Sequence, residues 1–143
     1  GGFWVYDPIQ QSLKRLDIDG REFTGTQLNS NWQSFNTQHL IERDGIIYIS
    51  SELSGLYTFD INGTYASKFG SDLSISENFQ VTRYQIIWYS AESIHFLNLN
   101  SLAEKKVPLP KNLRLTKVRN TLYCTDEKCY ALMNNRLYIY KIN

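Results

Sequence analysis

Short apolar segments recur along the chain, each followed by a polar turn, and no segment shows a helical apolar period of convincing length. The segments FWVYD (3–7), IIYIS (46–50) and IIWYS (86–90) carry apolar or aromatic residues at neighbouring positions, so both of their faces are apolar. A sheet with one face in water would alternate between apolar and polar residues instead. The pattern therefore predicts short strands in sheets that are covered on both faces.

One polar turn repeats almost unchanged along the sequence. The chain reads LDIDG at 16–20 and FDING at 59–63, and NLNS at 98–101 occupies the corresponding place further on. Asn-Gly and Asp-Gly favour tight hairpin turns, because Gly, Asn and Asp accept positive φ at low cost. Aligning the repeats on this turn superposes residues about 40 positions apart, namely Asp17, Asp60, Asn98 and Lys141.

A unit of four short antiparallel strands in about 40 residues has the size of a β-propeller blade. We expect an all-β chain that forms a single propeller segment of about three and a half blades, with approximate boundaries at 1–37, 38–77, 78–112 and 113–143. A β-sandwich is the rival architecture, but it does not need the same turn at the same place in each unit. The first blade begins at its second strand, so we expect the chain to be part of a larger or assembled ring.

The last blade can be divided in two ways. LTKVRN, TLYCT, CYALM and RLYIYKI would give four strands, whereas TLYCTDE, CYALM and LYIYKI would give three. In the core, the repeat predicts two sets of equivalent residues in successive blades. The first set is Val5, Tyr48 and Trp88, and the second is Leu16, Phe59 and Leu97.

The rhythm of WVYD (4–7) followed by LKRLDIDG (13–20), repeated as IIYIS and LYTFDING (56–63), resembles six-bladed propellers of the NHL and YWTD type. It is most similar to uncharacterised propeller proteins of the Bacteroidetes cell envelope, which often end in a strand like LYIYKI. This resemblance implies a periplasmic, cell-envelope or extracellular location. Its motifs are structural, so it implies the fold and is nearly silent on function.

The composition is that of a folded domain, since the 143 residues are 42% hydrophobic and 20% charged. Fifteen basic and 14 acidic side chains leave a net charge of +1. A near-neutral chain without a basic cluster argues against nucleic acid as a partner. No apolar stretch approaches the length of a membrane-spanning helix, and no motif requires a cofactor.

An incomplete ring would leave one apolar blade face in water at each end of the array, and exposed faces of this kind favour association. We expect the end blades to associate with missing blades or with a second copy of the chain, through an isologous or ring-closing contact.

Cys124 and Cys129 flank TDEK, and in a hairpin they would face each other across two strands. A disulfide and a pair of free thiols both fit the sequence, and an envelope location would permit the disulfide. With only His39 and His95 elsewhere, the cysteines match no metal-ligand spacing, so no metal site is expected. No Ser is framed as a nucleophile elbow, so no catalytic residue is assigned.

The segment LNSNWQSFNTQHL (28–40) joins two predicted blades. Its Asn31, Trp32 and Phe35 combine an aromatic platform with polar side chains, which is what sugar or peptide recognition requires. The alternative is that Trp32 fills the space between two blades.

His39 is predicted at the start of an inner strand, where side chains can reach the central channel of a propeller. Arg43 and Arg83 lie at similar places beside hairpin turns and can also line the end of that channel. A hydrogen-bonded structural His and ordinary solvated Arg residues fit the sequence as well.

Three functions remain open. The first is a non-catalytic scaffold of the cell envelope that recognises a protein, peptide or glycan on the propeller face. The second is a structural half-propeller subunit that another chain or copy completes. The third is a hydrolase or lactonase with a metal in the channel, which would need acidic or His ligands from several blades. The sequence names neither the ligand nor the total number of blades.

Overall fold

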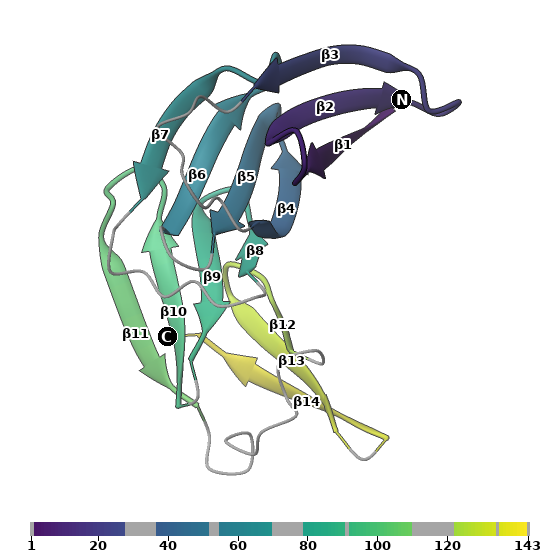
Figure 1. The fold of residues 1–143 in the computed structure, drawn as a ribbon. Coiled ribbons are helices and arrows are strands. Elements are labelled where there is room, and N and C mark those ends of the chain that lie inside the picture. The colour runs from purple at the N-terminus through teal and green to yellow at the C-terminus, as the bar shows by residue number, and fades with distance from the viewer. Residues whose placement is uncertain are drawn as a thin grey trace. The chain divides into compact units, whose positions relative to one another are not determined.

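A computed structural model describes residues 2–27, 37–51, 55–69, 79–90, 92–109, 122–133 and 135–142. All regular structure in these residues is β-strand, and every strand pair is antiparallel (Figure 1). The chain divides into two compact units, residues 1–77 and 78–143, each of which holds two sheets. The sheets follow the chain in the order expected from the sequence repeat.

The first unit contains a three-stranded and a four-stranded sheet. In the first sheet the order is β1 (Gly2–Asp7), β2 (Ser12–Asp17) and β3 (Glu22–Gln27). In the second sheet the order is β4 (Thr37–Arg43), β5 (Ile46–Ser51), β6 (Gly55–Asp60) and β7 (Tyr65–Phe69). Each sheet is a simple meander in which every strand pairs with the strand that follows it.

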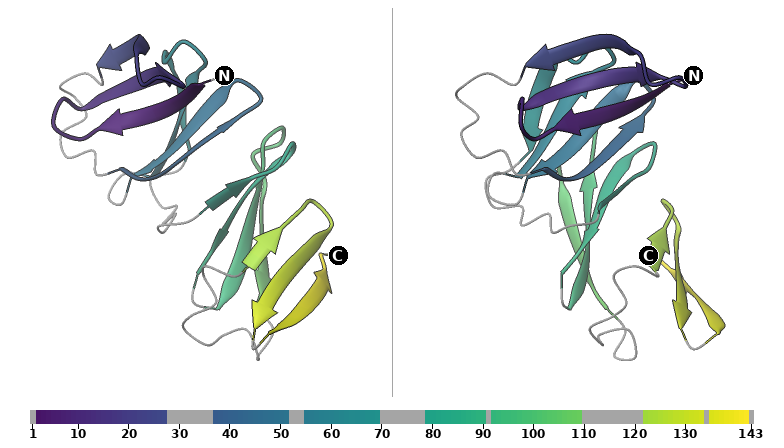
Figure 2. Two further views of the ribbon diagram at one scale, coloured as in Figure 1. Left: turned by 90° about the vertical axis from the view of Figure 1, so that its right-hand side faces the viewer. Right: turned by 45° about the vertical axis from the view of Figure 1, so that its right-hand side comes forward.

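The second unit repeats this plan (Figure 2). The third sheet is the meander β8 (Phe79–Val81), β9 (Gln85–Tyr89), β10 (Ser93–Asn98) and β11 (Glu104–Pro108). The last sheet has β12 (Leu122–Cys124), β13 (Lys128–Met133) and β14 (Arg136–Lys141). Residues 115–120, which the four-strand division of the last blade requires, lie outside the described residues.

The repeated turn has the same hydrogen bonds at its first two occurrences. The Oδ1 atom of Asp17 accepts the backbone N–H groups of Asp19 and Arg21, at 2.9 and 2.8 Å. Asp60 Oδ1 accepts the N–H groups two and four residues later, both at 2.8 Å. Asn98 Oδ1 accepts two N–H groups at its own turn, both at 2.9 Å. The predicted equivalence of these residues is therefore confirmed, and side-chain bonding to the turn explains the choice of Asp or Asn.

The strand register confirms the equivalence of one of the two predicted sets, in which Phe59 and Leu97 are buried and Leu16 is half-buried. Leu16, Phe59 and Leu97 each immediately precede the repeated turn, and each pairs with an equivalent residue of the preceding strand. These partners are Phe3, Ile47 and Ile86.

The prediction for Tyr48 is wrong. Counting from Leu16, Phe59 and Leu97, the register makes Ile49 equivalent to Val5 and Trp88. Tyr48 precedes Ile49 and therefore lies on the opposite face of its sheet. The strand letters align one residue out of register, and a shift of one residue moves a strand side chain to the other face.

Each sheet therefore has two faces that can be followed through the repeat. We call the face of Phe59 and its equivalents face 1, and the opposite face, which carries Thr58 and its equivalents, face 2. In the first unit, Trp4 and Leu13 on face 2 of the first sheet are buried in one cluster with face 1 of the second sheet. The face-1 residues in that cluster are Ile47, Ile49, Tyr57 and Phe59.

The second unit packs by the same rule. Face 2 of the third sheet supplies Ile87, Tyr89, Ile94 and Phe96 to a buried cluster. Face 1 of the last sheet supplies Cys129 and Ala131, with Tyr138 and Tyr140 packed against them. In both units, face 2 of one sheet covers face 1 of the next sheet along the chain.

The two four-stranded sheets are buried on both faces, as the apolar pattern of their strands predicts. In β5, Ile47 and Ile49 of face 1 and Tyr48 of face 2 are all buried. In β9, the same holds for Ile86 and Trp88 of face 1 and for Ile87 and Tyr89 of face 2.

The turn glycines provide a first test of this packing. Gly20 and Gly63 have φ angles of +81° and +82°, so alanine at either position costs about 1–2 kcal/mol of backbone strain. A Cβ atom on Gly63 would also lie 2.9 Å from Thr26 Oγ1 and 3.6 Å from the Trp4 ring, whereas a Cβ on Gly20 would meet nothing within 4 Å. We expect Gly63→Ala to lower the free energy of unfolding by about 1 kcal/mol more than Gly20→Ala does. Urea unfolding of both variants measures the difference, and equal losses would show that the turn does not pack on the first sheet.

The carboxylate at the second turn gives an expected pH dependence. Hydrogen bonds from the turn backbone, chiefly the Thr64 N–H, hold the pKa of Asp60 below its ordinary value of 3.8. The stabilisation by Asp60 is therefore complete above the ordinary pKa and is lost as the pH falls through the lower folded-state value. Asp60→Asn keeps an acceptor oxygen, as Asn98 does naturally, but cannot titrate.

We expect the melting temperature of Asp60→Asn to fall less steeply than that of the wild type between about pH 5 and pH 2. Asp7, whose pKa is lowered chiefly by the Gln10 N–H, remains in both proteins and accounts for part of the residual slope. Parallel melting-temperature curves would contradict the assigned role of Asp60.

Candidate interaction surface

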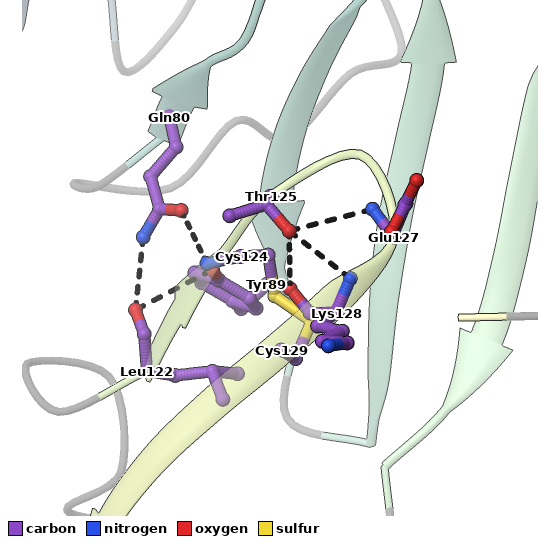
Figure 3. Close-up of a disulfide and its surroundings, with 8 residues drawn as sticks. All are labelled: Gln80, Tyr89, Leu122, Cys124, Thr125, Glu127, Lys128 and Cys129. Carbon is purple, nitrogen blue, oxygen red and sulfur yellow. Dashed lines mark hydrogen bonds between the residues drawn. A yellow bond between two sulfur atoms is a disulfide. The ribbon is translucent and has the colours of Figure 1, made fainter. Parts of the chain in front are cut away.

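A disulfide joins β12, the first strand of the last sheet, to the neighbouring strand β13. Cys124 and Cys129 are directly opposite each other in the β12–β13 pair, their Cα atoms are 4.1 Å apart, and the structure joins them covalently. Both side chains are buried on face 1, within the cluster shared with the third sheet. The hydroxyl oxygen of Thr125 closes the hairpin by accepting the Glu127 and Lys128 N–H groups (Figure 3).

One amide side chain of the third sheet, that of Gln80, forms hydrogen bonds with the backbone of β12. Gln80 donates from Nε2 to the Leu122 carbonyl at 2.9 Å and accepts the Cys124 N–H on Oε1 at 2.8 Å (Figure 3). These backbone groups belong to alternate residues of β12, so the side chain of Gln80 bonds them as a neighbouring strand would. Tyr89 adds a longer bond from its hydroxyl to Leu122 O at 3.5 Å, and burial raises the pKa of this hydroxyl well above its usual value.

The opposite face of the last sheet is apolar and uncovered in the described part of the chain. Tyr123 pairs with Tyr130, Tyr130 pairs with Ile139, and Leu132 pairs with Leu137, so these five side chains share face 2. The exposed fractions are 60% for Tyr123, 54% for Leu132, 61% for Leu137 and 58% for Ile139. We call these five residues the terminal face.

The first sheet exposes a face of the other type. Phe3 and Val5 of β1, with Lys14 and Leu16 of β2, lie on face 1, and Phe3 is 49% exposed. Lys14 Nζ lies 3.4 Å from Asp7 Oδ2 and 3.9 Å from Glu22 Oε2. We call Phe3, Val5, Lys14 and Leu16 the first face.

The sequence-predicted ligand residues are only partly covered by the structure. Asn31, Trp32 and Phe35 lie outside the described residues. His39 is half-buried in β4, and burial lowers the pKa of its imidazole. Its backbone carbonyl accepts a bond from the Ser50 hydroxyl at 3.5 Å.

The two arginines do not occupy equivalent positions. Arg43 is the last residue of β4, and its Nε lies 3.6 Å from Asp44 Oδ2. Arg83 lies within the β8–β9 turn, with its guanidinium 5.4 Å from the centre of the Tyr84 ring. Both side chains are exposed, as expected for solvated turn residues.

Sequence inspection did not identify a polar network on face 1 of the third sheet. His95 Nδ1 lies 2.9 Å from Glu104 Oε1, its Nε2 lies 3.2 Å from Ser90 Oγ, and its ring stacks on Trp88 with centres 5.0 Å apart. The order Ser–His–Glu has the connectivity of a hydrolase triad. However, the Ser90 hydroxyl also lies 3.3 Å from the Ser93 carbonyl in its own turn, and the contacts join β9, β10 and β11. We interpret the network as a structural one, which holds neighbouring strands of the sheet together.

Two further searches were negative for the part of the chain that the structure describes. No group of three or more His, Cys, Asp or Glu side chains there is placed to hold a metal ion. Nor do these residues contain a helix able to span a bilayer.

Comparison with known proteins identifies the fold. No protein-family model matches the sequence, and no curated protein is significantly similar to it. The N-terminal domain of Nup159 superposes with a TM-score of 0.55 and 9% identity, over 99% of this chain and 41% of that one. The AfRom2 CNH domain gives a TM-score of 0.51 and 10% identity, over 89% and 43% of the respective chains. Both are β-propellers. The four sheets are propeller blades.

The assignment of the sheets as propeller blades explains why an uncovered sheet face is informative. In a propeller each blade packs between two neighbours, so both of its faces are normally buried. The chain spans less than half the length of both similar structures. Within the described residues of each unit, the other sheet covers neither the first face of the first unit nor the terminal face of the second unit.

The amide of Gln80 offers a test of how the last blade is attached. Removing it in Gln80→Ala leaves the Cys124 N–H without its partner and the Leu122 carbonyl with only the longer bond from the Tyr89 hydroxyl, which costs about 1–3 kcal/mol. Gln80→Glu is the matched variant, because it retains an acceptor for Cys124 but replaces the donor to Leu122 by an anionic oxygen.

We expect faster hydrogen exchange at the Cys124 amide in Gln80→Ala than in Gln80→Glu, with Leu122 at the edge destabilised in both. Unchanged protection of Cys124 in the alanine variant would show that the disulfide alone holds this edge.

Proposed function

We propose that the chain is a non-catalytic protein-interaction scaffold whose binding surface includes the terminal face. The observation that carries this proposal is the exposure of Tyr123, Leu132, Leu137 and Ile139 side by side on one sheet. Soluble proteins rarely leave a contiguous apolar patch in water, and larger patches mark interaction sites. Burial of apolar surface contributes about 25 cal/mol per Å², so covering such a face favours binding.

The chemistry of the terminal face favours a protein over a glycan as the partner. Leu132, Leu137 and Ile139 supply aliphatic surface without hydrogen-bonding groups, whereas sugar recognition needs orienting polar groups around an aromatic ring. A glycan or peptide remains the better match for the segment of Asn31, Trp32 and Phe35, as a second surface of the same scaffold.

The type of propeller and its location in the cell are part of the same proposal. The turn repeat supports an NHL-like or YWTD-like propeller of the Bacteroidetes cell envelope, located in the periplasm or outside the cell. The Cys124–Cys129 disulfide fits such an oxidising location. No observation among the described residues favours the alternative of a channel-metal hydrolase or lactonase.

Site-specific photo-cross-linking in the cells that natively make the protein tests the proposal. A photoreactive side chain at Ile139 probes the terminal face, and the same side chain at Ile9, a 93% exposed turn residue, is the matched control. We expect a discrete protein adduct from position 139 and none from position 9. Equal adduct patterns at both positions, or no adduct at 139, would contradict the assignment of this face as a binding surface.

A further inference from the structure

The terminal face is the counterpart of a buried face in the same unit. The Thr82 hydroxyl accepts the Gln85 N–H at 3.0 Å. The Thr125 hydroxyl accepts the Lys128 N–H at 3.1 Å, so the two turns are equivalent and β9 and β13 begin at matching residues. Counted from these residues, the strand pairing aligns Tyr130, Leu132, Leu137 and Ile139 with Ile87, Tyr89, Ile94 and Phe96, in that order.

The contacts of the four counterparts show what such a face accepts within the second unit. Ile87, Tyr89, Ile94 and Phe96 are buried in one cluster with face 1 of the last sheet. That face supplies Leu122, Cys124, Cys129 and Ala131 from its first two strands, with Tyr138 and Tyr140 of the third strand packed against them. Large apolar side chains of a face 2 therefore pack here on a sheet whose first two strands carry mainly small side chains, which allows the two sheets to approach closely.

The terminal face carries almost the same side chains as its buried counterpart. Each set of four has one Tyr and three other large apolar residues. Leu and Ile are close in volume, so the two sets differ in size mainly by Ile139 in place of Phe96. Apolar exchanges that conserve volume are tolerated in packed cores. The terminal face is therefore built to pack on a sheet of the same kind.

We propose that the terminal face binds the face of another antiparallel β-sheet, one that carries small apolar side chains such as Ala and Cys on the strands that it lays on this surface. This inference rests on the proposed function, because it names the kind of partner that the same surface takes. A sheet is favoured over a helix because the equivalent face in the second unit packs on a sheet.

The margin of the terminal face adds a charge requirement. Lys128 and Lys141 pair with each other on face 2, where the third sheet has the neutral pair Gln85 and Asn98. Two ammonium groups at this margin favour a partner that places Asp or Glu opposite them. The partner is therefore a β-sheet face with a small apolar centre and an acidic margin.

Exchange of equivalent residues in the 143-residue chain tests the fit. The transplanted variant carries the terminal-face side chains on the third sheet, as Ile87→Tyr, Tyr89→Leu, Ile94→Leu and Phe96→Ile. The permuted control carries the same four residue types in other positions, as Ile87→Leu, Tyr89→Ile, Ile94→Tyr and Phe96→Leu. Both variants lose the bond from the Tyr89 hydroxyl to the Leu122 carbonyl, so this loss cancels in the comparison.

Hydrogen exchange of the β13 amides reports whether the last sheet stays packed on the third. We expect the transplanted variant to keep its protection to within about tenfold of the wild type, and the permuted control to lose at least about tenfold more. Equal protection in the two variants, or lower protection in the transplanted one, would show that the terminal-face side chains have no positional fit to a face 1. Either result would overturn this inference and leave the proposed function standing.

Cross-linking from position 139 in the native cells then identifies the partner. We expect the attached residue to lie in a β-strand that carries Ala or Cys on the same face, and Lys128→Glu with Lys141→Glu to lower the adduct yield at least about threefold. An adduct to a helix, or between the terminal faces of two copies, would overturn the inference but uphold the binding surface. Absence of any adduct at position 139 would remove the proposed function as well.

Discussion

The packing of face 2 of one sheet on face 1 of the next is the constraint on which the rest of the structure depends. A sheet of three or four short strands buries little surface of its own, so its stability comes from the sheets that cover it. Phe59 and Ile47 are fully buried in one cluster with Trp4 and Leu13 of the preceding sheet. The same arrangement in the second unit places the buried disulfide against Ile87 and Phe96. Each blade is therefore stable to the extent that its neighbour is present.

The strands and the fold class could be predicted from the sequence because their signals are local. The Asp-x-Asn-Gly turn at Asp60 is determined by hydrogen bonds within four residues, and the same chemistry is legible at Asp17. The equivalence of Tyr48 was mispredicted because the letters of IIYIS were aligned one residue out of register, and only the pairing of Ile47 with Phe59 reveals the true register. Thr82 and Thr125 were also overlooked, although their hydroxyls accept the same turn N–H groups in successive blades.

The candidate surface was predictable in part. The repeat of about three and a half blades indicated that the end blades would each carry an uncovered apolar face. The attachment of that blade was not predictable, because Gln80 meets β12 across 42 residues and its amide carries no motif. The network of Ser90, His95 and Glu104 likewise depends on three strands of one sheet. The partners of side chains that bond across strands depend on the strand register. The sequence alone did not determine that register to within one residue.

The contacts at the last blade suggest why an uncovered face is tolerated there at all. Its inner strand β12 has only three residues, and it is held by a disulfide to β13, by Gln80 and by the Tyr89 hydroxyl. These bonds fix the blade from its face-1 side and from its inner edge, so the strands remain ordered while Leu137 and Ile139 face water. Inside both units a face 2 covers a face 1, and neither cluster joins two faces of the same type. A partner that presents a face 1 to the terminal face would repeat this packing. The type of an exposed face is therefore more informative about its partner than any single residue on it.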